Sequence, residues 1–347
     1  MKNIWLAKLT KLALLPWHVL QLATHTKSFQ ANPVIGNSTL NKLGLHLWRR
    51  VLADKMARYR RSKLDAFMTD SERESYATYG YFIRRQALPE ADFNGLLQEI
   101  EQLRELGWEM RQGRAVTRRI SLDDDVLATH PYCRQVVKDK DINRLIEYAA
   151  SYQGSPTFEL QSIIVDPQQN ETDPQTVFHA DTFHATSKAW LFLHDINDDE
   201  GPFAYVPRSH ILTPERLAWE KEQSIMASQC SEQMHREGSF RISEEEMQGM
   251  GLMPPVRFAV KANTLIIADT SGFHARCPSL KPSHRVEIYA SLRRNPFIPW
   301  CGGHLYALPY IAGRHTMLDI KIKQLTQSAK GTWKAFDKVG AYDAENV

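Results

Sequence analysis

The sequence predicts a mainly β fold with flanking helices, and three observations support this prediction. Short apolar segments of strand length recur through the second half of the chain, and polar turn residues separate them. Amphipathic helical patterns come before these segments. A basic, helix-forming region comes before both. Several short strands with helices beside them are typical of a double-stranded β-helix, the jelly roll of the cupin type, here with an N-terminal helical extension.

The strands are predicted from apolar segments that are bounded by turn residues and are too short for helices. The predicted strands are Leu160–Val165, Thr176–His179, Ala189–His194, Phe203–Val206, Val256–Val260, Thr264–Ala268 and Val286–Leu292. The last of these alternates apolar and polar residues, so we expect it to be half-buried. A barrel built from such strands brings residues far apart in the sequence to one mouth.

Helices are predicted where apolar residues recur every three or four positions. Residues 89–106 show this spacing and are followed by Gly107, a natural helix C-cap. A second helix is expected over residues 141–152, and a basic helix over residues 40–67. Ser243 and Glu246 form a capping-box pattern, which predicts a short helix from that point.

The domain organisation follows from these elements. We expect a basic helical extension over residues 1–70 and a barrel domain over 71–295, with a charged insertion over 213–253. The insertion is predicted to overhang the barrel mouth, either as a substrate lid or as a simple surface excursion. Residues 296–347 are expected to pack on the domain as a lysine-bearing, helical tail. The 43% hydrophobic and 24% charged content is that of a folded globular chain.

The triplet His179, Ala180 and Asp181 is a candidate metal-binding motif. Positions two apart on an extended strand project from the same face, so the imidazole and the carboxylate can converge on one ion while Ala180 turns away. His274 follows another strand and supplies a second imidazole. Two imidazoles and one carboxylate on one face of an octahedron leave positions open, as a non-haem iron oxygenase requires.

Arg285 lies eleven residues after His274, on the strand that follows. Its planar, permanently charged guanidinium suits bidentate binding of a carboxylate. Each candidate also has an ordinary structural explanation: His274 as a core histidine, Arg285 as an exposed strand arginine, and the pair His179 and Asp181 as surface residues of a barrel without metal. The combination of all four residues favours the metal site.

These residues carry a family resemblance. The chain resembles the phytanoyl-CoA dioxygenase family of iron(II)- and 2-oxoglutarate-dependent oxygenases over residues 76–295. The sequence FHAD, which ends at Asp181, is similar to the family's first ligand motif, and GPFAYVPRSH (Gly201–His210) resembles its glycine-rich approach to a Pro-x-Ser-His turn. Phe203, Ala204 and Arg208 depart from the usual small or aliphatic residues of that turn, which leaves the substrate open.

The resemblance implies a mechanism and its cofactors. His179, Asp181 and His274 would hold Fe(2+), and Arg285 would bind the C5 carboxylate of 2-oxoglutarate. Trp190, at a position where the family carries an aromatic residue, would flank the co-substrate or simply belong to the core. O2 would then react to give a hydroxylated small organic or lipid-linked product, succinate and CO2. Desaturation, epimerisation and ligand binding without turnover are the alternatives, and Asp181 argues against halogenation.

Positive charge is concentrated at the N-terminus. Through residue 63 the chain has twelve Lys or Arg and one acidic residue, a net charge of +11, while the remainder has a net charge of −8. Residues 1–23 combine lysines with leucines and two tryptophans, which suits the interface of an anionic membrane. The alternatives are helices that pack on the barrel with solvated basic faces, a signal peptide, or nucleic-acid binding. No recognition motif supports nucleic acid as a partner.

Four cysteines without short paired spacing indicate neither a zinc site nor a disulfide framework (Cys133, Cys230, Cys277, Cys301). A reducing compartment fits this usage, so we expect a cytoplasmic protein with peripheral contact to the inner face of the membrane through residues 1–63. Substrate identity is not encoded in a recognisable motif. Arg118 and Arg119 are adjacent on a predicted strand, so at most one of them faces the pocket.

Overall fold

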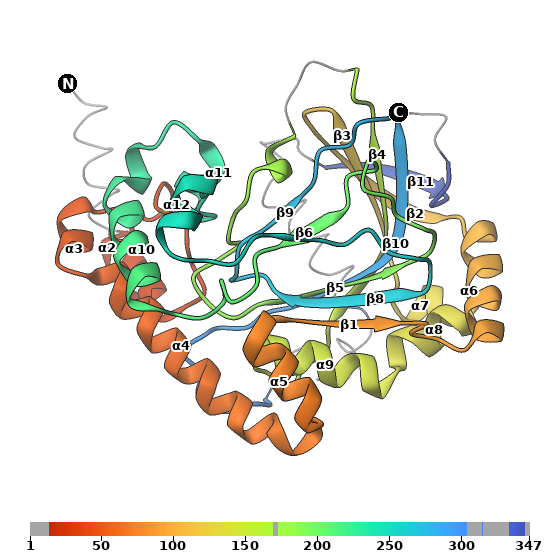
Figure 1. Ribbon diagram of the computed structural model, residues 1–347, viewed down its shortest axis with the longest axis horizontal. Coiled ribbons are helices and arrows are strands. Elements are labelled where there is room, and N and C mark those ends of the chain that lie inside the picture. Colours follow the sequence, from red (N-terminus) through yellow and green to blue (C-terminus); the bar gives the residue numbers. More distant parts are fainter. Residues whose placement is uncertain (1–13, 169–172, 304–313, 315–332, 344–347) are drawn as a thin grey trace.

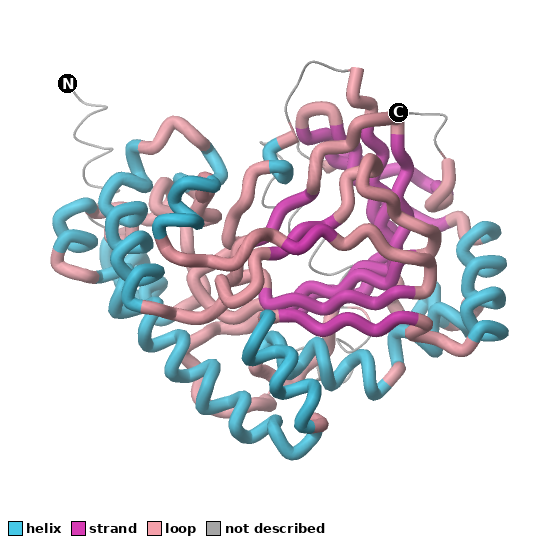
Figure 2. Tube along the Cα trace, in the orientation of Figure 1, coloured by secondary structure: helices cyan, strands magenta, loops and turns pink. Residues whose placement is uncertain are grey.

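The computed structural model describes residues 14–168, 173–303, 314 and 333–343. These residues form two antiparallel sheets surrounded by helices (Figure 1, Figure 2). The strands are β1 Tyr81–Arg85, β2 Glu105–Gln112, β3 Ala115–Ser121, β4 Thr157–Val165, β5 Ser187–Phe192, β6 Phe203–Tyr205, β7 Val256–Arg257, β8 Thr264–Asp269, β9 His274–Arg276, β10 Ser283–Leu292 and β11 Lys334–Val339. The α-helices are α2 Leu15–Leu20, α3 Ser38–Lys42, α4 Leu45–Leu64, α5 Asp70–Tyr79, α6 Glu90–Gln102, α7 Asp124–Leu127, α8 Pro131–Lys138, α9 Lys140–Ala150, α10 Pro214–Met226, α11 Gln233–Arg236 and α12 Glu244–Gly249. Short 3₁₀ turns occur at Gln21–Ala23, Asp65–Phe67, Pro174–Thr176 and Ala227–Gln229.

The larger sheet has the order β1-β8-β5-β10-β4-β3-β2-β11, and the smaller sheet has the order β7-β6-β9. From β4 to β10 the chain crosses repeatedly between the two sheets. Strands β4, β5, β8 and β10 lie in the large sheet, whereas β6, β7, β9 and the bridge residue His179 lie in the small one. Among these eight segments only β6 and β7 follow one another in the same sheet. This crossing pattern is that of a double-stranded β-helix, and it confirms the predicted fold class.

Strands β5, β8 and β10 are buried on both faces. Inward-facing Trp190 and Phe192 pack with Phe203 and Tyr205 of the small sheet, so these side chains fill the barrel. Outward-facing Leu191 and its neighbours join a second core beneath the helices. The expectation of a half-buried strand at residues 286–292 was therefore wrong, because the polar face that the sequence pattern left to solvent turns into the barrel and is covered by the small sheet.

Helices α5, α6, α8 and α9 cover the outer face of the large sheet (Figure 1). Helix α9 contacts β5, β8 and β10 directly. Its buried residues recur at helical spacing and form one apolar stripe: Ile142, Leu145, Ile146 and Ala149. The sheet is thus a middle layer, with helices on one side and the small sheet on the other.

Helix α4 packs on the same body, although its inward stripe is not apolar. The buried positions recur every three or four residues, but they include the large basic residues Arg49, Arg50 and Arg60. Arg60 donates to the carbonyl oxygens of Ser151 (2.7 Å), Pro296 (3.0 Å) and Ile298 (2.6 Å). Buried guanidinium groups are stable only when such acceptors surround them.

The predicted insertion contains α10, α11 and α12. The capping box at Ser243 and Glu246 is present at the start of α12, which confirms that prediction. Helix α10 packs against α3 and α4, so it joins the insertion to the N-terminal helices. The lid role and the domain boundaries at residues 70 and 295 stay predictions.

A further difference concerns the end of the predicted helix over residues 89–106. The helix predicted over residues 89–106 ends at Gln102, and Gly107 lies inside β2 instead of capping a helix. A side chain at Gly107 would lie 2.3 Å from Val339 Cγ2, so the glycine permits the close approach of β11. That contact comes from a segment more than 200 residues away, which no local pattern reveals.

The segment predicted as a strand over residues 176–179 forms a 3₁₀ turn and then single β-bridges of His179 with Arg241 and His274. The expected helical tail is wrong for its described part. Lys334 and Lys338 lie in strand β11, which pairs with β2. The tail residues 304–313 and 315–332, and residues 1–13 of the predicted membrane segment, lie outside the described residues.

The ion pairs of Glu220 join the insertion to the N-terminal helices, and substitution of this residue tests how much they stabilise the fold. Its buried carboxylate accepts from Arg50 Nε (3.1 Å) and Arg216 Nε (2.9 Å) and contacts His46 Nε2 (2.9 Å). We expect Glu220→Gln to lower the free energy of unfolding by about 3–5 kcal/mol, because it leaves two buried guanidinium groups without a counter-charge. Urea denaturation measures this, with Glu222→Gln on the exposed face of α10 as the control. A loss as small as that of the control would contradict the coupling.

Candidate metal centre

The structure brings together three side chains that are up to 95 positions apart in the sequence. The backbone of His179 exchanges two hydrogen bonds with that of His274, each 3.0 Å long. Asp181 N donates to the carbonyl oxygen of Thr270 at 2.9 Å, just before His274 in the chain. Backbone hydrogen bonds between the two segments therefore fix the relative Cα positions of all three residues.

The donor atoms of these residues face one another. His179 Nε2 lies 3.8 Å from Asp181 Oδ1, and His274 Nε2 lies 3.6 Å from Asp181 Oδ2. All candidate ligand atoms lie within 4.8 Å of one another. Ligand atoms on one ion at about 2.1 Å are about 3 Å apart when adjacent, so small side-chain rotations suffice to bind a metal. Among the described residues, this is the only such group of three or more His, Cys, Asp or Glu.

Both imidazoles present the correct nitrogen. His179 Nδ1 lies 2.8 Å from the carbonyl oxygen of Val177, and His274 Nδ1 lies 3.1 Å from that of Gly272. Because a carbonyl oxygen only accepts, each Nδ1 carries the proton and each Nε2 is left with its lone pair. A metal would bind at Nε2.

The protonation states also suit a metal. Burial lowers the pKa of His179 well below its ordinary value and lowers the pKa of His274 to about 4. Burial would raise the pKa of Asp181, but Lys188 and the two histidines hold it well below its usual range. The site therefore contains two neutral imidazoles and an ionised carboxylate at neutral pH, the forms in which these residues bind metals.

Asp181 is the most exposed of the three residues. The two histidine side chains are 4% and 5% exposed, whereas that of Asp181 is 23% exposed. Three protein donors leave coordination positions free, which fits an iron centre that must also bind a co-substrate and dioxygen.

Arg285 lies inside the barrel and is buried. It reaches across to the segment that precedes β6, where Nη1 donates to the carbonyl oxygen of Gly201 at 2.7 Å. Its Nε lies 2.9 Å from Glu287 Oε2, close enough for an ion pair but not aligned for a hydrogen bond. Gln161 donates to the other oxygen of Glu287. The role of Arg285 towards 2-oxoglutarate stays a prediction.

Trp190 also faces the barrel interior. Its ring packs on Phe203 at 4.3 Å between centroids and lies 6.2 Å from Tyr289. Phe203 in turn lies 6.0 Å from His274. Trp190 is therefore a core residue that is one aromatic ring removed from a candidate ligand. Contact with a co-substrate stays a prediction.

Sequence reasoning missed two lysines at this site. Lys188 Nζ lies 2.7 Å from Asp181 Oδ2, and Lys27 donates to the backbone oxygen of Asp181. Burial lowers the pKa of Lys27 to about 8. Lys188 lies two residues before Trp190 on β5, so the two-residue period of a strand could have placed both side chains on the inward face. Lys27 lies in an irregular segment, and no sequence pattern there predicts its position.

The adjacent arginines of β3 face opposite ways, as their spacing predicted. Arg118 pairs with Glu109 and donates to the carbonyl oxygen of Gly340 (2.9 Å). Arg119 pairs with Glu159 and lies 4.7 Å above the ring of Tyr289, which alternates with Glu287 and Arg285 on β10. Only Arg119 turns towards the barrel interior.

Comparison with known proteins gives one family. The family model described as "Phytanoyl-CoA dioxygenase (PhyH)" matches residues 76–262, just over half of the chain. The match ends before His274 and Arg285, so their placement comes from the structure. No curated protein matches the chain.

Solved structures of low sequence identity also match. The epimerase SnoN in complex with Fe3+, alpha ketoglutarate and nogalamycin RO shares 18% identity with a TM-score of 0.43, over 63% of this chain and 80% of that one. HygX from Streptomyces hygroscopicus with nickel, 2-oxoglutarate and hygromycin B shares 14% identity with a TM-score of 0.38, over 71% and 95%. The carbocyclase SnoK shares 16% identity with a TM-score of 0.41, over 66% and 84%.

The pKa values of the two histidines predict how metal affinity depends on pH. The pKa of His274 is lowered to about 4 and that of His179 lies well below its ordinary value, so a metal displaces no proton from either imidazole, and we expect the iron(II) dissociation constant to change less than threefold between pH 8 and pH 6. Anaerobic equilibrium titration measures it. Two histidines with an ordinary pKa of 6.5 would instead weaken binding roughly sixteenfold over this range, and that result would contradict the assignment.

Proposed function

Because the chain belongs to the phytanoyl-CoA dioxygenase family of iron(II)- and 2-oxoglutarate-dependent oxygenases, we propose that it hydroxylates a small organic or lipid-linked molecule, releasing succinate and CO2. The observation that carries this proposal is the cluster of His179, Asp181 and His274, whose donor atoms lie within 4.8 Å of one another. Two imidazoles and one carboxylate, open on one side, are the ligand set of such oxygenases.

In this proposal each residue has a defined task. His179, Asp181 and His274 hold Fe(2+) through two Nε2 atoms and a carboxylate oxygen. Arg285 binds the C5 carboxylate of 2-oxoglutarate, exchanging its ion pair with Glu287 for one with the co-substrate. Bound iron and 2-oxoglutarate supply the activation of O2, and the protein supplies orientation and a dry pocket.

The aromatic lining of the barrel supports this division of tasks. Trp190, Phe203 and Tyr289 exclude water from the space between the two sheets. Exclusion of water strengthens the ion pairs formed there and protects a reactive centre from side reactions. We propose hydroxylation and not desaturation or epimerisation. Labelled O2 distinguishes these reactions, because only hydroxylation transfers one of its oxygen atoms into the product.

We also propose a cytoplasmic protein with peripheral contact to anionic membrane. All four cysteines are free, which suits a reducing compartment. No helix among the described residues is long and apolar enough to cross a bilayer. Helix α2 nevertheless exposes large apolar side chains, of which Trp17 is 58% and Leu20 65% exposed. An exposed tryptophan and leucines are typical of a helix that lies in a membrane interface.

The cofactor assignment predicts a visible charge-transfer band. Anaerobic addition of iron(II) and then 2-oxoglutarate should produce the band of the chelate in the wild-type protein. We expect Asp181→Ala to abolish the band and the turnover of 2-oxoglutarate, because only two ligands remain. Arg285→Ala should keep the band but raise the 2-oxoglutarate dissociation constant at least tenfold, because a charge-assisted bidentate pair is lost.

Arg257→Ala is the matched control, since this arginine is exposed on β7. It should leave the titration unchanged. Absence of the band in the wild-type protein would overturn the cofactor assignment. An unchanged titration in Arg285→Ala would remove Arg285 from the co-substrate site.

Membrane contact predicts that the protein floats with vesicles that contain phosphatidylserine. We expect Trp17→Ser combined with Leu20→Ser to reduce the floated fraction several-fold, because less apolar surface enters the interface. Leu280→Ser is the control, as it changes an exposed leucine outside the N-terminal helices. Equal flotation of all three proteins, or none in the wild type, would refute contact through α2.

A further inference from the structure

Residues 22–30, here called the mouth segment, lie against the candidate metal centre although they precede the family match. Arg49 of α4 donates to three carbonyl oxygens of this segment: Leu22 (3.0 Å), Thr24 (3.0 Å) and Thr26 (2.6 Å). On the other side, Phe29 N donates to the carbonyl oxygen of Arg236 at 2.9 Å. The segment is thus held between α4 and the insertion.

The mouth segment brings Lys27 to the candidate ligand Asp181. Lys27 Nζ donates to the backbone oxygen of Asp181, and Lys188 Nζ lies 2.7 Å from its carboxylate. Gly238 permits this approach, because a side chain there would lie 2.3 Å from the carbonyl oxygen of Lys27. An ammonium group therefore contacts the backbone of a candidate metal ligand.

Cations outnumber carboxylates at this mouth: Asp181 acts electrostatically on Lys27 and Arg241, and Glu232 acts on Arg241, but neither is an ion-pair partner of these cations. Arg241 bonds to neutral atoms only: Ser239 Oγ (2.7 Å) and the carbonyl oxygens of Ser239 (3.2 Å) and Pro174 (3.5 Å). Among the described residues, neither Lys27, Arg49 nor Arg241 forms an ion pair with a carboxylate side chain. Asp181 is paired with Lys188, and Glu220 is paired with Arg50 and Arg216.

The proposed cofactors do not remove this surplus. Iron(II) carries two positive charges and 2-oxoglutarate two negative charges, so together they add none. Lysine and arginine that are withdrawn from water without counter-ions are costly, and they are typical of sites where an anionic ligand completes the charge balance. The surplus at the mouth thus matches a negatively charged group on the substrate.

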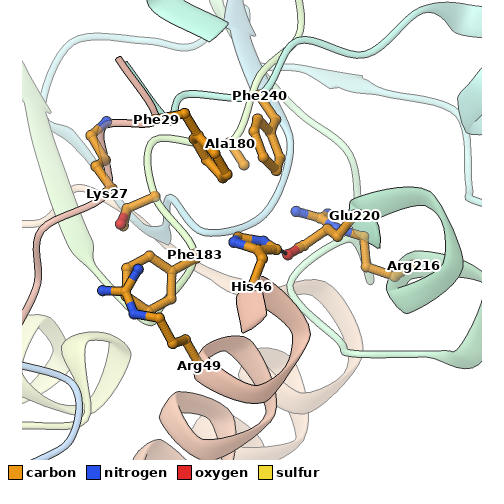
Figure 3. Close-up of a pocket in the computed structure, with 11 residues that line it drawn as sticks. Lys27, Phe29, His46, Arg49, Ala180, Phe183, Arg216, Glu220 and Phe240 are labelled. Atoms are coloured by element: carbon orange, nitrogen blue, oxygen red, sulfur yellow. Dashed lines mark hydrogen bonds and ion pairs between the residues drawn. The ribbon is translucent and has the colours of Figure 1, made fainter. Parts of the chain in front are cut away.

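Aromatic side chains form the neighbouring wall. A small cavity adjoins the mouth segment and is lined by Phe29, Phe183 and Phe240 together with Ala180 (Figure 3). Its free space of about 10 Å³ is about what one water molecule needs, so a ligand enters only if this wall moves. Lys27 and Arg49 lie at one end of this wall (Figure 3). At the other end lie His46, Glu220 and Arg216, which are paired with one another. The surroundings therefore combine an aromatic surface with two cations at the end that is nearer to Asp181 and with mutually paired charges at the other.

Resting on the proposed function, we infer that the substrate is an amphipathic anion and that Lys27 binds its carboxylate or phosphate group beside the metal. The apolar part of the substrate lies along the aromatic wall. Lys27 is in this view a residue that selects and orients the substrate. Arg49 holds the mouth segment in place through its three carbonyl contacts.

The test uses full-length protein loaded with iron(II) and 2-oxoglutarate under anaerobic conditions. The probes are hexanoate and hexyl phosphate, compared with hexanol and hexylamine at constant ionic strength. Binding is followed by perturbation of the chelate band and by the rise in the thermal unfolding midpoint. We expect the anionic probes to bind saturably and the neutral and cationic ones not to bind.

Three variants make the result specific. Lys27→Gln should raise the dissociation constant of the anionic probes about tenfold or more, because a charge-assisted bond is lost. Lys27→Arg should retain most of the affinity, and Lys55→Gln, on the exposed face of α4, should change nothing. A chelate band in Lys27→Gln shows that this variant is folded and loaded.

The alternative source of the anion is 2-oxoglutarate itself. If Lys27→Gln weakens 2-oxoglutarate as strongly as Arg285→Ala does, Lys27 serves the co-substrate and the inference fails. It also fails if the anionic probes do not bind, or bind wild type and Lys27→Gln equally, while the chelate band forms. Absence of the band in the wild-type protein would instead overturn the proposed function.

Discussion

The buried carboxylate of Asp269 is the contact on which the arrangement of the helices around the barrel depends. It accepts from Arg61 of α4 (3.1 Å) and from the hydroxyl of Tyr76 on α5 (2.7 Å). It also accepts from the backbone nitrogens of Thr186 and Ser271. One side chain thus joins two helices, the start of β5 and the turn that leads to His274.

This contact links packing to chemistry. The turn after Asp269 carries the carbonyl oxygen of Thr270, which fixes Asp181, and it ends at His274. Arg216 of the insertion donates to the carbonyl oxygen of Ser271 in the same turn, at 3.3 Å. The geometry of the candidate ligands therefore depends on charged groups outside the barrel strands as well as on the barrel itself.

Local sequence pattern was sufficient for the barrel and for the central cluster. Apolar segments such as residues 264–268 gave the strands, because both faces of a buried strand are apolar. The spacing of His179 and Asp181 predicted two convergent side chains, and they do converge, although single β-bridges at His179 and the backbone bond of Asp181 to Thr270 replace the expected strand. The structure places His274 beside them, as the jelly-roll topology requires.

Local sequence pattern failed to predict structure where contacts between distant parts of the chain determine it. Nothing near Gly107 shows that β11 will pack over it, and nothing near Lys27 shows that its side chain will reach Asp181. The basic residues of α4 were expected to be solvated or bound to lipid. Arg49, Arg50 and Arg60 are instead buried, because their acceptors come from other parts of the chain.

The buried arginines of α4 also bear on the order in which the chain folds. Arg60 finds its carbonyl acceptors at Pro296 and Ile298, and Arg61 finds Asp269, all more than 200 residues later. During synthesis the first helices therefore emerge long before their partners, and contacts of such sequence separation form slowly. A strongly basic helix stays hydrated and self-repelling during that wait, whereas an apolar stripe would invite aggregation.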